Sequence, residues 1–286
     1  MAETSLTPAN YEFVARLLRE QCGLILESGK EYLVKSRLWP LAQRHDIAGV
    51  DQLIERLRSS GANGLLTEVV EAMVTTETSF FRDIHPFETL RKILLPELIE
   101  RRRSQRQLNI WCAASASGQE PYSIAILLHE YFPELAAWNI NFSATDISHE
   151  MLTRSRAGRY SQVEVNRGLP TPLLLKWFRQ EGGAWQLDDR VRHAVRFSHL
   201  NLAQSWPAMT TWDLVFLRNV MIYFENDLKS VILNRVARLM RPDGYLVLGG
   251  AETTLNLSDS FSRVEALKSG FYQLKSSFSF QHSTMP

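Results

Sequence analysis

The sequence predicts a doubly wound α/β domain preceded by a small all-helical domain. From Thr7 to about Thr75 the apolar residues recur at helical spacing, with no alternating run. From about residue 107 short segments that are apolar throughout alternate with amphipathic helices, as expected for a parallel sheet covered on both faces. A chain of 286 residues is also long enough for two domains.

The helical N-terminal domain is predicted to span residues 1–75. Thr7 followed by Pro8 is a favourable N-cap and first helical residue. Gly49 and Gly61 bracket the helical segment VDQLIERLRSS. We therefore expect a small helical bundle or cap.

A linker at residues 76–106, which contains a predicted helix from Pro86 to Arg103, leads into the core domain at residues 107–276. The predicted strands are LNIWCAAS (108–115), INFSATDI (140–147), VRFSHLNL (195–202), WDLVFLRNV (212–220) and YLVLGGAE (245–252). Residues 277–286 are expected to form a flexible tail.

The segment at residues 160–194 interrupts the alternation of strands and helices. Its Gly182-Gly183 pair is flanked by short runs that have the composition of strands, which indicates a small inserted β subdomain. A long crossover with one extra helix and a turn is the alternative, and the sequence alone leaves both open.

The charge composition argues against a nucleic-acid-binding protein. The net charge of +1 gives no global basic field, so we expect no nucleic-acid partner. The basic run Arg101, Arg102, Arg103 and Arg106 follows an apolar helical stretch and is interpreted as a solvated helix end, with a phosphate or acidic-partner patch as the alternative.

The two cysteines, Cys22 and Cys112, lie far apart, which argues against a disulfide framework or a zinc site. The N-terminus lacks the pattern of a signal peptide, and no stretch approaches the roughly 20 apolar residues of a membrane span. We expect a cytoplasmic protein without direct membrane insertion.

The stretch NIWCAASASGQEPYS, residues 109–123, is the most informative one for chemistry. A buried strand ends in small residues, turns at Gly118 and starts a helix at Pro121. Small side chains at a strand end before a helix N-terminus let a ligand approach the backbone at the carboxyl edge of the sheet. The stretch is neither GxGxxG nor a P-loop, so a nucleotide-like ligand other than a dinucleotide or ATP is favoured.

The second predicted strand ends with Asp146. An acid at this position can accept hydrogen bonds from two ribose hydroxyls. Its alternative role is the N-cap of the following helix. Together with the loop before it, the ribose role is favoured.

Five motifs in order, TTETSFFRD, GQEPYS, ATDI, RNVMIYF and RPDGYLVLGGAE, resemble the CheR chemoreceptor methyltransferase family. The resemblance covers the chain from about Thr75 to the last strand, and the helical N-terminal region is similar in size and type to the family's N-terminal domain. It implies a class I methyltransferase sheet, S-adenosylmethionine as cofactor with S-adenosylhomocysteine as product, and no metal. The implied reaction is methylation of glutamate side chains on the cytoplasmic domain of membrane chemoreceptors.

The resemblance also assigns cofactor contacts: Thr76, Thr78, Arg82, Glu120, Asp146, Asn201, Leu202, Arg218 and Asn219. Thr76 departs from the family, which commonly has Asn there. Arg82 and Tyr223 are the implied catalytic residues, with Arg82 near the methyl-transfer site and Tyr223 facing the acceptor. Asp146 would contact the ribose, and Asn201 with Leu202 would lie near the adenine.

Taken without the resemblance, these residues have plainer roles. Arg82 would be an ion-pair partner of Asp83 or Glu88, and Tyr223 a core aromatic with a locally satisfied hydroxyl. Phe80 and Phe81 are expected to pack the linker against the core.

The implied reaction agrees with the residues present. A glutamate carboxylate has a reference pKa of about 4.3 and is already ionised at neutral pH, so no general base is needed. The seven histidines follow no triad or metal spacing, and His149 and His199 are interpreted as surface-helix and strand residues. Arg82 is expected to position the carboxylate without gripping it tightly, because charge is lost in the transition state.

Partner contacts are expected from the helical domain, where Lys30, Lys35, Arg37 and Arg44 form a partly coherent basic side or simply a solvated face. The turn RQEGGAWQLDD is shorter than in relatives that tether a receptor peptide, so we expect no tethering, and we expect a monomer. The alternatives are a methyltransferase for another acceptor and a non-catalytic S-adenosylmethionine-binding adaptor.

Overall fold

The computed structural model describes residues 6–60, 63–265, 267 and 270–276. The chain divides into two compact units. The first comprises residues 1–75, 201–205 and 223–228, and the second comprises residues 76–200, 206–222 and 229–286. The tail predicted at residues 277–286 lies outside the described residues.

The described residues from 6 to 75 form the helices α1 (Pro8–Cys22), α2 (Glu31–Arg44), α3 (Val50–Ser60) and α4 (Asn63–Met73), so the predicted all-helical N-terminal domain is confirmed. The predicted start of α1 is confirmed, since the Thr7 hydroxyl accepts a hydrogen bond from the Asn10 amide at 3.3 Å and Pro8 is the first helical residue. The helix ends at Gly23, whose left-handed backbone (φ 74°) suits glycine. The apolar faces of the helices supply the buried core of this unit.

The second unit is built on a seven-stranded sheet with the order β6-β2-β1-β7-β8-β10-β9. The strands are β1 (Gln107–Ala113), β2 (Asn139–Asp146), β6 (Arg196–His199), β7 (Trp212–Leu217), β8 (Met240–Leu248), β9 (Phe261–Arg263) and β10 (Phe271–Leu274). The first five of these are parallel to one another, and β10 and β9 pair antiparallel at one edge. The prediction of a doubly wound α/β sheet is confirmed.

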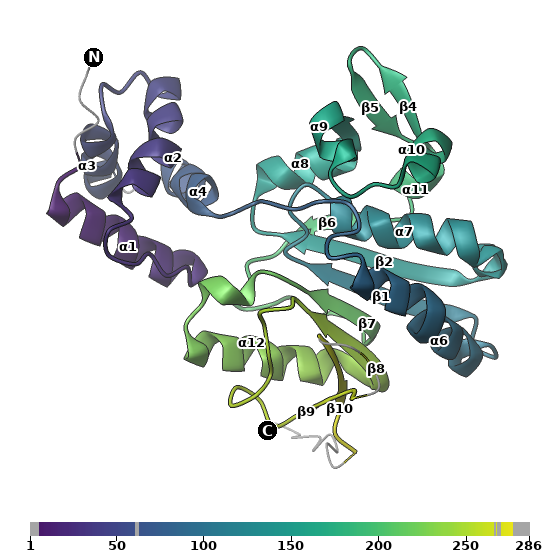
Figure 1. Cartoon of the computed structure of the whole chain (residues 1–286). Helices are drawn as coiled ribbons and strands as arrows, with labels where there is room; N and C mark the ends of the chain where they lie inside the picture. Colours follow the sequence, from purple (N-terminus) through teal and green to yellow (C-terminus); the bar gives the residue numbers. More distant parts are fainter. Residues whose placement is uncertain (1–5, 61–62, 266, 268–269, 277–286) are drawn as a thin grey trace. The chain divides into compact units, whose positions relative to one another are not determined.

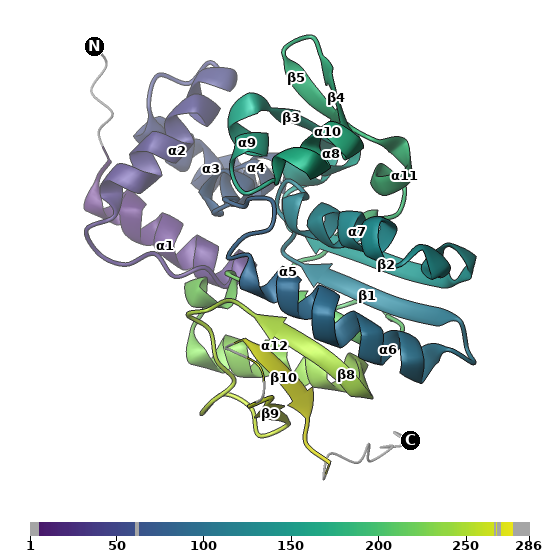
Figure 2. The same ribbon diagram turned by 45° about the vertical axis from the view of Figure 1, so that its right-hand side comes forward.

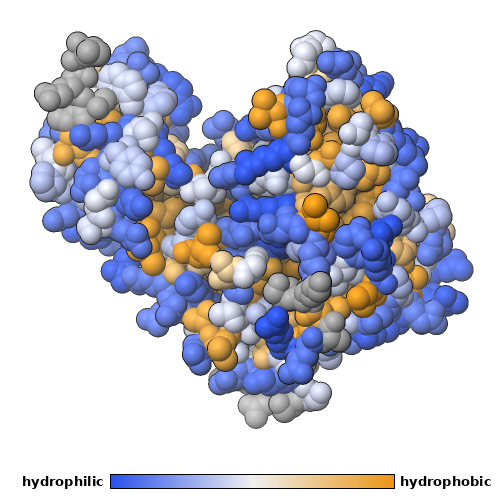
Figure 3. Space-filling view, viewed as in Figure 1, coloured by the Kyte–Doolittle hydropathy of each residue, from blue (hydrophilic) through white to orange (hydrophobic). Residues whose placement is uncertain are grey.

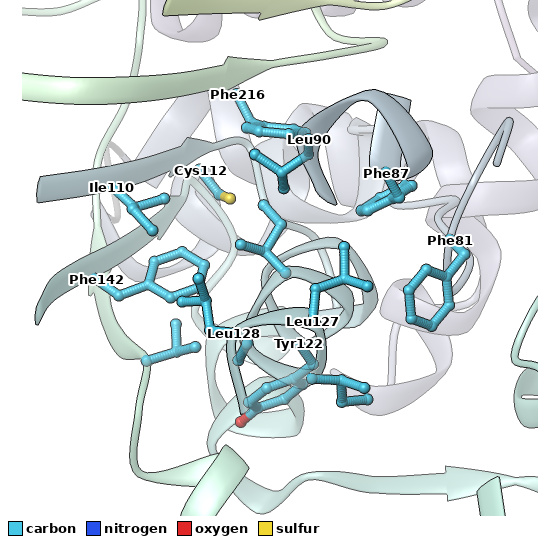
Figure 4. Close-up of a cluster of buried hydrophobic side chains, with 14 of the residues drawn as sticks. Phe81, Phe87, Leu90, Ile110, Cys112, Tyr122, Leu127, Leu128, Phe142 and Phe216 are labelled. Carbon is cyan, nitrogen blue, oxygen red and sulfur yellow. The ribbon is translucent and has the colours of Figure 1, made fainter. Parts of the chain in front are cut away.

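Helices cover both faces of this sheet. They are α5 (His85–Thr89), the π-helical turn η1 (Leu90–Leu94), α6 (Leu95–Arg102), α7 (Gln119–Tyr131), the 3-10 helix η2 (Pro133–Ala137), α8 (His149–Ala157), the 3-10 turn η3 (Met221–Tyr223) and α12 (Asn226–Leu239). Figures 1 and 2 show α6 and α7 on one face and α12 on the other. The core under α6 and α7 contains Phe87, Leu127 and Phe216 (Figure 4).

The insert contains a three-stranded antiparallel sheet in the order β3-β5-β4, which confirms the small β subdomain and excludes the plain crossover. Its elements are β3 (Arg159–Ser161), α9 (Gln162–Asn166), α10 (Thr171–Trp177), β4 (Phe178–Glu181), β5 (Ala184–Leu187) and α11 (Asp189–Arg192). Gly182 and Gly183 form the turn between β4 and β5, with φ of 53° and 79°.

The interpretation of the basic run as a solvated helix end is wrong for Arg102. Its side chain is 6% exposed and donates to Asp213 at 2.6 Å and to Asp243 at 2.8 Å. Asp213 also accepts the Asn109 amide at 2.8 Å, so the pair joins the end of α6 to the starts of β1 and β7. A buried guanidinium is stable here because both neighbouring carboxylates compensate its lost hydration.

The face drawn in Figure 3 is mainly hydrophilic, with apolar areas interspersed among the hydrophilic residues. Within the described part of the chain, no helix is long and apolar enough to cross a membrane.

Candidate functional site

The loop after β1 has an unusual backbone. Ala114, Ala116 and Gly118 all adopt positive φ angles, of 54°, 47° and 91°. The Ser115 amide donates to the Thr145 carbonyl at 2.9 Å, which fixes the loop against the end of β2. Non-glycine residues in this conformation are strained, and such strain concentrates at ligand sites. The loop of small residues thus leads from the end of β1 to the N-terminus of α7 in a fixed conformation.

Asp146 joins this loop to the next one. Its carboxylate accepts the Ala116 amide at 2.8 Å and the Ser148 amide at 2.9 Å. The alternative role of Asp146 as the helix N-cap is wrong, because Ser148 is the cap of α8 and accepts the Met151 amide at 3.2 Å. The buried Asp146 carboxylate therefore lies at the carboxyl end of β2, beside the loop after β1.

Arg218 follows β7 and lies between two acids. Its side chain is 1% exposed, and it donates from Nη1 to Glu120 and from Nη2 to Asp83, each at 2.7 Å. Burial raises the pKa of the Glu120 carboxyl, and the Arg218 charge opposes that rise. Two residues predicted to bind cofactor, Glu120 and Arg218, are thus in direct contact.

Two buried polar atoms at this edge have no hydrogen-bond partner within the described chain: the Ser115 hydroxyl and Arg218 Nε. β1 and β7 are parallel neighbours, with Ala113 opposite Leu217, so both residues leave adjacent strand ends. An unsatisfied buried polar group costs about 1–3 kcal/mol. A polar ligand at the strand ends would satisfy both.

The segment before α5 packs against the core through its two phenylalanines, as predicted. The Phe80 ring meets Tyr160 and Phe178 edge-on, with centroids 5.0 Å and 5.5 Å apart. The Phe81 amide donates to the Ser123 hydroxyl at 2.9 Å, in the first turns of α7. The segment is therefore fixed beside the N-terminus of α7.

Arg82 lies half-buried on this segment and donates to the Glu77 carbonyl at 3.2 Å. Its alternative role as an ion-pair partner of Asp83 or Glu88 is not what the structure shows. Asp83 pairs with Arg218, and Glu88 pairs with Arg91 and Lys92. Thr76 and Thr78 lie half-buried on the same segment.

Sequence reasoning missed Glu252, which holds the loop after β7. Its Oε2 accepts the amides of Asn219 at 2.7 Å and Gly249 at 2.8 Å, and its Oε1 accepts those of Val220 at 2.9 Å and Met221 at 2.8 Å. The available signal was the acid that ends the motif YLVLGGAE, shortly after the end of β8 at Leu248. Asn219, with φ 58°, is fixed by this carboxylate.

The other three predicted site residues belong to the first unit. Asn201 donates from its side chain to the Gln21 carbonyl at 2.7 Å and accepts the Ala203 amide at 3.0 Å. Leu202 is buried, and Tyr223 is half-buried, with its carbonyl accepting the Ile25 amide at 3.0 Å.

The histidines occupy the places predicted for them. His149 begins α8, His199 ends β6, and their exposed rings stack with centroids 4.4 Å apart. Across the described residues, no group of three or more His, Cys, Asp or Glu side chains is arranged to hold a metal ion.

Comparison with known proteins gives matches over both parts of the chain. Residues 76–269 match the CheR methyltransferase, SAM binding domain, and residues 9–74 match the CheR methyltransferase, all-alpha domain. Chemotaxis protein methyltransferase 1 of Pseudomonas aeruginosa is 39% identical over 276 residues, which cover 95% of this chain and 100% of the relative. The chemotaxis protein methyltransferase of Vibrio parahaemolyticus is 38% identical over 279 residues, with 96% and 100% covered.

Proposed function

This chain belongs to the CheR methyltransferase family, and from that premise we propose that it transfers methyl groups from S-adenosylmethionine to glutamate side chains of bacterial chemoreceptors, forming methyl esters in chemotaxis adaptation. The main structural support is that Asp146, Glu120 and Arg218 lie at one edge of the sheet, beside the segment that contains Arg82.

The residues present fit S-adenosylmethionine. The Asp146 carboxylate is suited to ribose hydroxyls. The ligand's methionine part has a carboxylate and an ammonium group, which complement Arg218 Nε, the Ser115 hydroxyl and the Glu120 carboxylate. When bound, this cofactor supplies an electrophilic methyl group. We propose further contacts from Thr76, Thr78, Asn201, Leu202 and Asn219.

The acceptor carboxylate needs orientation and no proton removal, since it is ionised at neutral pH. Arg82 attracts the carboxylate by its charge, and the Tyr223 hydroxyl donates a hydrogen bond to it. Half-burial of Arg82 keeps this attraction moderate. A tight ion pair would stabilise the ground state, because the charge on the acceptor disappears during transfer. Alignment of the reacting atoms is therefore the proposed source of rate acceleration.

We further propose that the enzyme acts as a cytoplasmic monomer without tethering a receptor tail. The turn of the β subdomain consists of Gly182 and Gly183 alone, between β4 and β5. Calorimetric titration with a peptide of the receptor C-terminus should give no heat of binding at micromolar concentrations. Saturable micromolar binding would overturn this part of the proposal.

The reaction is tested with tritiated S-adenosylmethionine and receptor-containing membranes. Carboxyl esters release labelled methanol in base, whereas base-stable label would identify a different acceptor. Mutation of Arg82→Ala should lower transfer about 100-fold or more through lost alignment, while the Kd for S-adenosylhomocysteine changes less than about threefold.

A matched control is Arg103→Ala, since Arg103 is an exposed arginine paired with Glu100 on a surface helix end. This variant should transfer methyl groups at the wild-type rate. Near-normal turnover by Arg82→Ala would remove the assigned role of Arg82.

A further inference from the structure

The turn around Arg82 is strained. Phe81, Asp83 and Ile84 have φ angles of 48°, 69° and 50°, in the left-handed region that disfavours L side chains and a β-branched residue most of all. Three such residues among four persist only where surrounding contacts hold them. The turn therefore depends on specific partners.

Those partners meet at Arg218. Its Nη2 donates to the Asp83 carboxylate at 2.7 Å and to the Arg82 carbonyl at 3.2 Å. Its Nη1 is held by Glu120 at 2.7 Å, so the guanidinium has a fixed orientation. One buried arginine thus binds both the main chain of Arg82 and the side chain that follows it.

The exposed position of Asp83 indicates whether its contact with Arg218 serves mainly the stability of the protein or mainly the geometry of the site. Its side chain is 55% exposed, so water screens the carboxylate even though its partner Arg218 is buried, and the pair contributes correspondingly less to stability. The carboxylate nevertheless lies next to the residue proposed to orient the acceptor. We therefore expect the Asp83 carboxylate to affect mainly the position of Arg82 and less the stability of the protein.

We propose that Asp83 is a positioning residue for methyl transfer: through Arg218 it holds the left-handed turn that aims Arg82 at the acceptor carboxylate. This inference rests on the proposed function. Because Arg218 also contacts Glu120 in the first turn of α7, the turn is fixed relative to the cofactor edge of the sheet.

The test compares Asp83→Asn and Asp83→Glu with a control, Asp189→Asn. Asp189 is 66% exposed and pairs at 2.9 Å with Arg192, which is 27% exposed, so the control removes a similarly exposed carboxylate from an ion pair within the β subdomain. Asp83→Asn should lower kcat about 10- to 100-fold, as expected for misplaced reacting groups. KM and the Kd for S-adenosylhomocysteine should change less than about threefold, and Asp83→Glu should recover part of the loss.

The double variant Arg82→Ala/Asp83→Asn provides the decisive measurement. If Asp83 acts through Arg82, adding the second substitution should lower kcat no further than Arg82→Ala alone. If the loss of kcat in the double variant equals the product of the losses in the two single variants, the inference is overturned. It is also overturned if Asp83→Asn has the same kcat as the control Asp189→Asn. An inactive Arg82→Ala enzyme beside a normal Asp83→Asn enzyme would reject this inference and leave the proposed function intact.

Discussion

The carboxylate of Glu252 is expected to hold the loop after β7 in place, and the substitution Glu252→Gln tests this. In the wild type its two oxygens accept four backbone amides, from Asn219, Val220, Met221 and Gly249. Glutamine has nearly the same shape, but one of its oxygens is replaced by an NH2 group. Whichever way the amide is oriented, two of the four backbone donors then face another donor.

The size of the expected decrease in stability follows from these two lost hydrogen bonds. A hydrogen bond to a charged group contributes about 1.5–3 kcal/mol, so two of them give a loss of about 3 kcal/mol or more in the free energy of unfolding. In a domain of about 200 residues each kcal/mol corresponds to about 2–4 °C in Tm. The expected decrease in Tm is therefore about 6–12 °C.

Thermal unfolding followed by circular dichroism measures this decrease, with Glu134→Gln as the control because Glu134 is an exposed residue of η2. The Glu252→Gln variant should also bind S-adenosylhomocysteine more weakly, since Asn219 leaves its fixed position. A change in Tm of less than about 2 °C, equal to that of the control, would refute the reasoning.

Two further predictions concern a close backbone approach and an ion pair. A Cβ at Gly168 would lie 2.1 Å from the Phe80 carbonyl oxygen, so Gly168→Ala should destabilise the protein by several kcal/mol. Gly183 has a similar positive φ but open space around it, so the control Gly183→Ala should cost about 1 kcal/mol. Equal decreases in Tm for the two variants would contradict this. The hydrogen bond to Arg102 lowers the pKa of Asp243 in the folded protein below its ordinary value of 3.8. The unfolded state therefore binds the proton first as the pH falls, and the stability that this pair contributes is lost below about pH 3.8. Acid titration of unfolding should show a smaller loss in Asp243→Asn, and an unchanged acid slope would contradict the pairing.

The sequence predicted the sheet for a local reason, whereas the roles of the site residues remain predictions. In a parallel sheet the carboxyl ends of the strands share one edge, so Asp146, at the end of an apolar run, can be placed there without a structure. Glu120 was assigned only through the resemblance to the family. The segment from Pro86 to Arg103 was predicted as one helix, but the structure inserts a π-helical turn at Leu90–Leu94. The spacing of apolar residues in a single π-helical turn is too similar to that in an α-helix for the sequence to reveal the turn.

The contacts that orient the site residues were beyond the sequence for a different reason. Arg218 meets Asp83 across 135 residues of chain, and the Ser123 hydroxyl meets the Phe81 amide across 42. Neither spacing follows from a helix or strand period, since each depends on how separate elements pack. The buried ion pair of Arg102 was misjudged for the same reason, because its partners come from strands far along the chain.

The energetics of Arg218 and Glu120 argue for a functional origin of their contact. Burial raises the pKa of Glu120, so the native state favours the proton more than the unfolded state does, and ionisation at neutral pH lowers stability. A buried ion pair of this kind gives little net stability compared with apolar residues of similar size. Arg218 also keeps Nε buried without a partner in the described chain, which adds to the cost. Proteins often retain such costly groups where a ligand or a catalytic geometry requires them. The proposed function gives Arg218 both tasks, since it would contact the cofactor and it holds the turn that contains Arg82.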